Sequence, residues 1–399
     1  MPHTIRTLEP LLDPQERLDR LIASTFRRFG PRIVDLSYAN PCDGPTAEVV
    51  SILTRVTAES TGLSLQYTPI AGRTPARRAV AARLARQFGL PFDYRDVILT
   101  SGAMPALNIV SRALFGPADE VIVLTPAWQD YPLYLRNLNI PFRLVALSGN
   151  KRLDLEAIRC AVGPSTRGVL LSQPCCPTGV VYSDAEIDGL ATILTEAEAR
   201  FGAPIYLVSD EVHRDLVWGA RPFSSPLHHY ARTVSIYSFG KALSLQGQRI
   251  GYIAVSPRMP HLEEIRSTIE RCVRLMGYGS PTSTMQRAVP ELLDCTPQLA
   301  SLASNQVRVR AALTAYGYTV CEGGASFYVY VKSPIDDDFR FAERLAARGV
   351  LVVPSTMFHD PGYVRLSLTA RSQAIAAGLP VFATVVNELR QGEPCFSPC

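Results

Sequence analysis

The feature that most constrains the fold is a regular alternation, over residues 97–255, of short apolar runs with longer helical patterns. The apolar runs are residues 97–100, 120–124, 168–172, 205–209, 233–237 and 252–255. Helical patterns lie between most of them, for example at residues 105–114 and 185–200. Strands that are apolar on both faces and separated by helices are typical of a largely parallel sheet with helices on both sides. The sequence therefore predicts an α/β domain with right-handed connections.

The chain changes character after residue 282. A long helical pattern at residues 297–316 leads into short apolar runs and further helical stretches, which indicates a smaller α+β domain. A short amphipathic helix is expected at residues 16–29, and we expect this N-terminal segment to join the smaller domain. A chain of 399 residues has room for both. The predicted division is a large domain at residues 41–280 and a small domain made of residues 1–40 and 281–399.

Composition argues against several classes of function. A net charge of +4 is small for this length, whereas a protein that binds nucleic acid needs clustered positive charge. No apolar stretch reaches the roughly 18 residues of a membrane span, and charges throughout the first thirty residues argue against a signal peptide. Nine cysteines without a CxxC pair suggest buried thiols rather than a metal site. We expect a cytoplasmic protein that binds neither metal, nucleic acid nor membrane.

Lysine is rare in this chain. The three lysines are Lys151, Lys241 and Lys332, so 37 of the 40 basic residues are arginine. Because this chain supplies nearly all of its positive charge with arginine, a lysine within the small-residue stretch 238–249 suggests that the amine of Lys241 is needed. A primary amine can form a Schiff base and a guanidinium cannot. With Arg249 eight residues further on, the stretch could hold a carbonyl cofactor that carries a phosphate. A surface lysine in a loop is the alternative that spacing alone leaves open.

The residues that follow five of the apolar runs form a consistent set, because ligands of open parallel sheets bind at the carboxyl ends of the strands. In chain order they are the small residues Gly102, Ala103 and Met104, then Trp128, the turn 173–179, Asp210, and Ser238 with Lys241. Backbone N–H groups of small residues at the start of a helix can bind an anion. A planar, phosphorylated, nitrogen-containing aldehyde would use all of these groups.

The same stretches make the chain resemble the fold-type I enzymes that depend on pyridoxal 5'-phosphate, in the class I/II aminotransferase family. The matching motifs, in the family's order, are YTPIAGRTPAR at 67–77, TSGAMPAL at 100–107, TPAW at 125–128, PTG at 177–179, SDEVH at 209–213, SFGK at 238–241 and VRLS at 364–367. Each motif is weak alone, but seven in order are specific, and the resemblance extends over about residues 33–389. It implies an aminotransferase-like fold, with a large domain on a mostly parallel sheet flanked by helices and a smaller α+β domain.

The resemblance also implies the residues that bind the cofactor. Lys241 would form the Schiff base with pyridoxal phosphate and later move the proton from the substrate Cα. Asp210 would pair with the pyridine nitrogen and keep it protonated, and Trp128 would stack on the ring. The phosphate would be bound by the backbone of Gly102, Ala103 and Met104 and by the side chains of Ser238 and Arg249.

Further residues would bind the substrate or a second subunit. Arg365 matches the arginine that binds the substrate α-carboxylate, and Ala39 lies where the family closes backbone over that carboxylate. Tyr67 matches a tyrosine that reaches the phosphate of the neighbouring subunit, so the resemblance implies a homodimer with shared active sites. The candidates to line the substrate pocket are Tyr38, Tyr131 and Phe358.

Two positions depart from the usual family pattern. Cys176 replaces the asparagine of the NPTG motif, and His213 stands where tyrosine is frequent. In the family, both residues donate hydrogen bonds to the phenolic oxygen of the cofactor, whereas a thiol is a poor donor. Because more negative charge would stay on that oxygen, we hypothesise that the Schiff base of Lys241 has a higher pKa than in a typical aminotransferase. The alternative is that Cys176 merely fills space beside Cys175.

The preferred interpretation is an enzyme that acts on an α-amino acid by forming a substrate–cofactor Schiff base, removing the Cα proton and transferring the amine to a 2-oxo acid. The alternative is a lyase or cyclase that eliminates or replaces a β- or γ-substituent, since residues 209–219 are similar to those of carbon–sulfur lyases of the same fold. A regulator with this fold but without catalysis is a third class. It would need a DNA-binding module, for which the segment before residue 33 leaves no room. The sequence does not name the amino acid.

Overall fold

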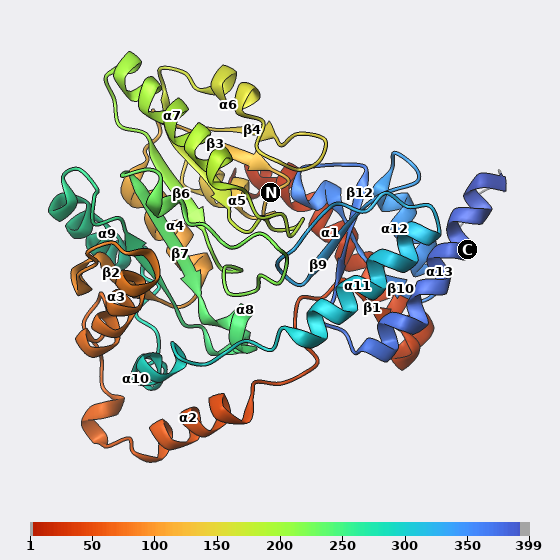
Figure 1. Ribbon diagram of the computed structural model, residues 1–399, viewed down its shortest axis with the longest axis horizontal. Helices are drawn as coiled ribbons and strands as arrows, with labels where there is room; N and C mark the ends of the chain where they lie inside the picture. Colours follow the sequence, from red (N-terminus) through yellow and green to blue (C-terminus); the bar gives the residue numbers. More distant parts are fainter. Residues whose placement is uncertain (1–2, 392–399) are drawn as a thin grey trace.

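The computed structural model describes residues 3–391, and a seven-stranded sheet forms the centre of its larger part (Figure 1). The strands, in spatial order, are β2 (Val97–Thr100), β8 (Gly251–Val255), β7 (Thr233–Ser238), β6 (Tyr206–Asp210), β5 (Thr166–Ser172), β3 (Glu120–Thr125) and β4 (Phe142–Ala146). Every neighbouring pair from β7 to β4 is parallel, and β8 is antiparallel to both of its neighbours. The predicted mostly parallel sheet is confirmed.

Two strands differ from the pattern that the sequence suggested. The edge strand β4 was not predicted, because Arg143 interrupts its apolar residues and only Val145 among the five is fully buried. The strand β8 runs antiparallel because it returns directly after the short helix α8 (Phe239–Leu243) and the 3-10 turn η5 (Gln246–Gln248), without a crossover helix. The first difference follows from the weak apolar pattern of β4, and the second from the short connection that precedes β8.

Helices cover both faces of the sheet, as expected. On one face α4 (Ala103–Leu114), α5 (Tyr131–Asn137) and α9 (Leu262–Met276) bury residues against the strands, and on the other α6 (Leu155–Ala161) and α7 (Asp184–Phe201) do so. The start of α7 shows how local sequence fixes a boundary. Ser183 and Glu186 form a reciprocal capping box, and Gly202 ends the helix with φ of 67°.

The smaller part contains a three-stranded antiparallel sheet and the two ends of the described chain. Its strands are β11 (Val353–Pro354), β12 (Tyr363–Ser367) and β9 (Tyr328–Lys332), and its helices are α1 (His3–Phe29), α11 (Ala300–Ala315), α12 (Asp338–Ala346) and α13 (Ser372–Gln391). The N-terminal segment also supplies β1 (Val34–Asp35), which pairs in parallel with β10 (Val350–Leu351). Figure 1 shows this part beside the larger sheet. The helix α1 begins at His3, whereas the sequence pattern predicted a start at residue 16.

The chain crosses between the two parts more than once. The helix α10 (Ser283–Leu292) contributes Met285 and Val289 to a core cluster with α2 (Ala47–Ala58), α3 (Thr74–Phe88) and strands of the large sheet. The division into residues 41–280 and the remainder stays a prediction. The packing of α10 favours a second boundary after Leu292.

No helix within residues 3–391 is long and apolar enough to cross a membrane. The seven cysteines in this range are free, and Cys395 and Cys399 lie outside it. The same range contains no group of three or more histidine, cysteine, aspartate or glutamate side chains arranged to hold a metal ion.

A buried ion pair ties α9 to the start of the sheet and generates a stability prediction. Arg266 Nε donates to Asp96 Oδ1 at 2.9 Å, and Asp96 is fully buried. Replacing Arg266 with methionine leaves this carboxylate without its cation, which should lower the free energy of unfolding by about 3–5 kcal/mol. The measurement is urea unfolding, with Arg274→Met on the exposed side of α9 as the control. Equal losses in the two variants would contradict a stabilising role for the pair.

Candidate active site

The carboxyl edge of the large sheet gathers most of the predicted site residues. Asp210 ends β6 and Ser238 ends β7, and Lys241 follows in α8. The strand β2 points to the same edge because β8 lies antiparallel between it and β7, so Gly102 at the start of α4 lies there too. Trp128 follows β3. It is partly buried and packs against two hydrophobic core clusters. The parallel topology therefore brings these residues to one place.

Asp210 is a buried carboxylate with two hydrogen-bond donors. The Tyr131 hydroxyl donates to Asp210 Oδ2 at 2.6 Å, and the backbone N–H of Val212 donates to Oδ1 at 3.2 Å. Burial raises the pKa of Asp210, while the Tyr131 hydroxyl, the Val212 amide and the charge of Lys241 lower it. Tyr131, which the sequence suggested only for the pocket wall, supports this carboxylate from α5.

The Lys241 amine lies near the aromatic ring of Phe327 and the charged side chains of Arg365 and Asp210. Its Nζ is 5.3 Å from the centre of the Phe327 ring, and within residues 3–391 it makes no hydrogen bond or ion pair. Burial lowers the pKa of Lys241 below its ordinary value, the charge of Arg365 adds to this shift and the charge of Asp210 opposes it. A lysine with a lowered pKa is more often neutral and nucleophilic than an ordinary lysine.

Gly102 and Arg249 form a cradle at the N-terminus of α4. Gly102 has φ of 89°, a backbone conformation that favours glycine, and a Cβ atom there would lie 2.6 Å from Arg249 Nη2. The backbone of Ala103 and Met104 opens the helix beside it. Ser238 Oγ, from the neighbouring β7, donates to the carbonyl of Ile250 at 3.3 Å. A helix N-terminus, a guanidinium and a hydroxyl together suit a phosphate.

Arg365 presents buried N–H groups that lack partners. Its guanidinium carbon lies 4.2 Å from the centre of the Tyr328 ring and 4.8 Å from that of Phe358, and Nη2 donates to the carbonyl of Ser37 at 3.1 Å. The Nε and Nη1 atoms are buried and have no hydrogen-bond partner in the part of the chain that the structure describes. Leaving such donors unpaired is costly, and a carboxylate ligand would satisfy them.

Cys176 carries a buried thiol near the amine. Burial raises the pKa of Cys176 to about 12, although the charges of Arg365 and Lys241 lower it. The thiol is therefore protonated and neutral at neutral pH. The adjacent Cys175 faces a different core cluster, with its Sγ 3.8 Å from the carbonyl oxygen of Pro126.

His213 is buried beside the same amine and has a polar contact with Ser326. Its Nδ1 lies 3.3 Å from Ser326 Oγ, and its ring meets those of Phe327 and Tyr328 edge-on. Burial lowers the pKa of His213 well below its ordinary value, and the charges of Lys241 and Arg365 lower it further. The imidazole is therefore neutral.

Two predicted residues are exposed in the single chain. Tyr67 is fully exposed, and Tyr38 is 65% exposed, with its carbonyl accepting a hydrogen bond from Thr369 Oγ1 at 3.0 Å. Ala39 is partly buried, two residues after the Ser37 carbonyl that Arg365 contacts.

Two aromatic residues of the site were not predicted from the sequence. Phe327 and Tyr328 were taken only as part of an apolar run that leads into a strand, yet both pack against site residues. The available signal was their place after a glycine-rich turn, because strand ends and tight turns commonly carry functional residues.

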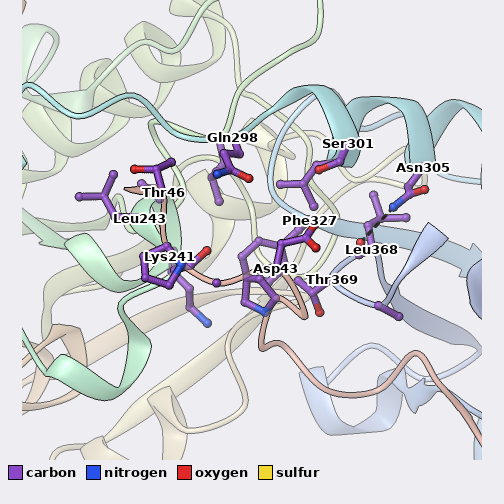
Figure 2. A pocket seen from close by; sticks show the side chains of 18 of the residues that line it. Asp43, Thr46, Lys241, Leu243, Gln298, Ser301, Asn305, Phe327, Leu368 and Thr369 are labelled. Atoms are coloured by element: carbon purple, nitrogen blue, oxygen red, sulfur yellow. Dashed lines mark hydrogen bonds between the residues drawn. The ribbon is translucent and has the colours of Figure 1, made fainter. Parts of the chain in front are cut away.

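A cavity of about 150 Å³ lies beside Lys241, between the larger and smaller parts of the chain (Figure 2). Its wall comes from the N-terminal loop, α8, the start of α11 and the end of the small sheet at which Phe327 and Leu368 lie. The side chains labelled in Figure 2 are Asp43, Thr46, Lys241, Leu243, Gln298, Ser301, Asn305, Phe327, Leu368 and Thr369. Lys241 therefore borders a partly open cavity with a mixed polar and apolar lining.

The chain resembles known proteins over most of its length. Residues 31–376 match the family model described as aminotransferase class I and II. The chain belongs to this family. It is 31% identical to the aspartate/prephenate aminotransferase of Thermus thermophilus, over 92% of this chain and 94% of that protein. It is 30% identical to a probable N-succinyldiaminopimelate aminotransferase of Mycobacterium tuberculosis, over 74% of this chain and 75% of that protein.

Solved aminotransferase structures have the same fold. An aminotransferase from Eubacterium rectale superposes with a TM-score of 0.89 at 26% identity, covering 93% of this chain and 95% of that one. The aspartate aminotransferase of Thermus thermophilus with maleate gives 0.82 at 28% identity, covering 92% and 96%. The predicted family and fold are thus confirmed, and the protein is an enzyme, a transferase. The family implies pyridoxal phosphate, and nothing in these comparisons favours the lyase alternative.

The charges around Lys241 predict how its pKa responds to substitution. Asp210→Asn removes a negative charge that favours the ammonium form, so the pKa of Lys241 should fall further. Arg365→Met removes a positive charge that disfavours the ammonium form, so the pKa of Lys241 should rise. The measurement is competitive acetylation of the cofactor-free protein across a pH series, with the label on Lys241 quantified by mass spectrometry.

Asp336→Asn, at an exposed carboxylate, is the control and should leave the midpoint unchanged. Shifts of the same sign in Asp210→Asn and Arg365→Met would show that these charges do not act on the amine as described.

Proposed function

We propose that this enzyme transfers the amine of an α-amino acid to a 2-oxo acid with pyridoxal 5'-phosphate as its cofactor. The observation that carries the proposal is the pair formed by the unpartnered Lys241 amine and the buried, unsatisfied N–H groups of Arg365. The first group suits an aldehyde and the second a carboxylate. The names of the relatives, aspartate/prephenate and N-succinyldiaminopimelate aminotransferase, support amino transfer.

The residues at the carboxyl edge of the sheet fit this cofactor. Lys241 would hold the aldehyde carbon, Asp210 the pyridine nitrogen, and the cradle of Gly102 and Arg249 the phosphate. Trp128 would cover a ring face, with Ala103, Met104, Ser238, Cys176 and His213 as the remaining contacts. When bound, pyridoxal phosphate supplies an aldehyde that condenses with amines and a ring that accepts the electrons released at the substrate Cα.

The side chains of this chain supply orientation and proton transfer. Arg365 would bind the α-carboxylate and so fix the direction of the Cα–H bond. Burial lowers the pKa of Lys241, which makes its amine a better acceptor for the Cα proton than an ordinary lysine, and the amine can return a proton at the end of the cycle. Asp210, buried and held by the Tyr131 hydroxyl, keeps its acceptor oxygens fixed throughout.

We also propose a homodimer with shared active sites. The segment that contains the fully exposed Tyr67 also exposes Leu63 and Leu65, at 86% and 60%. Such a stretch of exposed apolar side chains is typical of an interaction surface, and Tyr67 matches the residue that in the family reaches the neighbouring subunit. A cytoplasmic location is likewise a proposal, supported by the free cysteines of residues 3–391.

The reaction can be decided by product analysis without an acceptor. The purified holoenzyme is mixed with L-aspartate, L-glutamate, L-phenylalanine, L-alanine, L-cysteine and S-methyl-L-cysteine in turn. Amino transfer predicts one equivalent of 2-oxo acid and conversion of the cofactor to its pyridoxamine form. Lys241→Ala should abolish turnover, whereas Lys332→Ala, at an exposed lysine, should not.

Released ammonia with an unchanged cofactor would replace this proposal with the eliminating alternative. Full turnover by Lys241→Ala would remove the amine from the mechanism.

The thiol at position 176 predicts a change in the cofactor spectrum. In Cys176→Asn an amide can donate to the phenolic oxygen of the cofactor, where the thiol is a poor donor. The pH midpoint of the change in visible absorbance should fall by about one unit, because a hydrogen bond to a charged oxygen contributes roughly 1.5 kcal/mol. Cys175→Ser, whose thiol faces another cluster, is the matched control. An unchanged midpoint in Cys176→Asn would mean that this side chain only fills space.

A further inference from the structure

Lys151 is a buried lysine that the reaction does not use. It lies in the loop after β4 with φ of 61°, and only 4% of the residue is exposed. Its Nζ is 2.9 Å from Asp360 Oδ1 and 2.8 Å from Oδ2. A buried ammonium is costly unless a partner holds it closely, and here the partner comes from the smaller part of the chain.

Two aromatic rings enclose this ion pair. The Tyr330 hydroxyl donates to Asp360 Oδ2 at 2.6 Å, and the Tyr363 ring lies with its centre 4.0 Å from Lys151 Nζ. The two rings are stacked, with centres 5.0 Å apart and an angle of 9° between their planes. The Lys151 ammonium group therefore contacts both the Asp360 carboxylate and the face of the Tyr363 ring.

Asp360 belongs to a segment that also forms one wall of the Arg365 site. This wall segment comprises residues 355–362, between β11 and β12. It contains Phe358, whose ring lies against the Arg365 guanidinium. On the small-domain side Asp338 accepts hydrogen bonds from Ser355, Thr356 and Gly362.

The wall segment is attached to the large sheet at only a few described points. The N–H of Ala127, next to Trp128, donates to the carbonyl of Phe358 at 3.1 Å. His359 Nε2 lies 3.5 Å from the carbonyl of Gln129. The Lys151–Asp360 pair is the charged attachment, and it lies two residues from Phe358.

We propose that Lys151 is a positioning residue for recognition of the substrate carboxylate. Through Asp360 it holds the wall segment against the large sheet, so that Phe358 stays packed on Arg365 and the guanidinium faces the amine of Lys241. This inference rests on the proposed function, since it assigns a carboxylate to Arg365.

The test compares Lys151→Met with the wild type on a substrate that has a carboxylate and on one that lacks it. The substrates are the amino acid of the panel above that reacts fastest and its carboxamide. The half-saturating concentration of the amino acid should rise about tenfold in Lys151→Met, the size of a hydrogen bond to a charged group, with the limiting rate nearly unchanged. The carboxamide should show no such rise, because Arg365 does not hold it.

Lys332→Met is the matched control, since its lysine is exposed, and should behave as the wild type. In the double variant Lys151→Met, Asp360→Asn, the half-saturating concentration should rise no further, because the two residues act as one unit. Thermal unfolding establishes that each variant is folded. If Lys151→Met does not fold, Asp360→Asn takes its place in the same comparison.

An equal rise for amino acid and carboxamide, or no rise for either, would overturn the inference. A fall in the limiting rate without a rise in the half-saturating concentration would also overturn it. If the wild type does not react with the carboxamide, the comparison of limiting rate with half-saturating concentration for the amino acid decides the question. Failure of the proposed function is a separate result, because the wild type would then convert no amino acid of the panel.

Discussion

The carboxylate of Asp210, buried at the end of β6, is the group on which the rest of the site depends. A buried carboxylate persists as an anion only where donors and a positive charge face it. Tyr131 supplies a hydroxyl from α5, and Lys241 supplies charge from α8. These residues come from separate segments of the chain, so the carboxylate can be satisfied only when helices and sheet are all in place. The chemistry of the site is thereby tied to complete folding of the large part.

Much of this arrangement is predictable because parallel strands impose a common edge. Once residues 97–255 are recognised as alternating strands and helices, Asp210, Ser238 and Lys241 must lie at that edge, whatever their other contacts. The rarity of lysine adds independent weight to Lys241. Topology thus converts short motifs, each weak alone, into one site. The roles of the individual residues remain predictions, since geometry shows their proximity and not their chemistry.

Other features could not be predicted because they depend on side-chain contacts between segments far apart in the sequence. Nothing local distinguishes Lys151 from a surface lysine, since its partner Asp360 is 209 residues away. The same holds for Tyr131, which looked like a pocket residue until its hydroxyl was placed on Asp210. The edge strand β4 was missed for a different reason, because an edge needs only one apolar face and its pattern is correspondingly weak.

The scarcity of lysine has a practical consequence for handling the protein. Lys241 is partly buried and Lys151 is buried in an ion pair, so Lys332 is the one exposed lysine among the three. Among the lysines, amine-directed dyes, biotin esters or resins would therefore attach to the folded chain chiefly at Lys332 on β9. Attachment through Lys332 gives nearly uniform orientation on a surface. Conversely, lysine-based chemical cross-linking would yield little distance information for this fold.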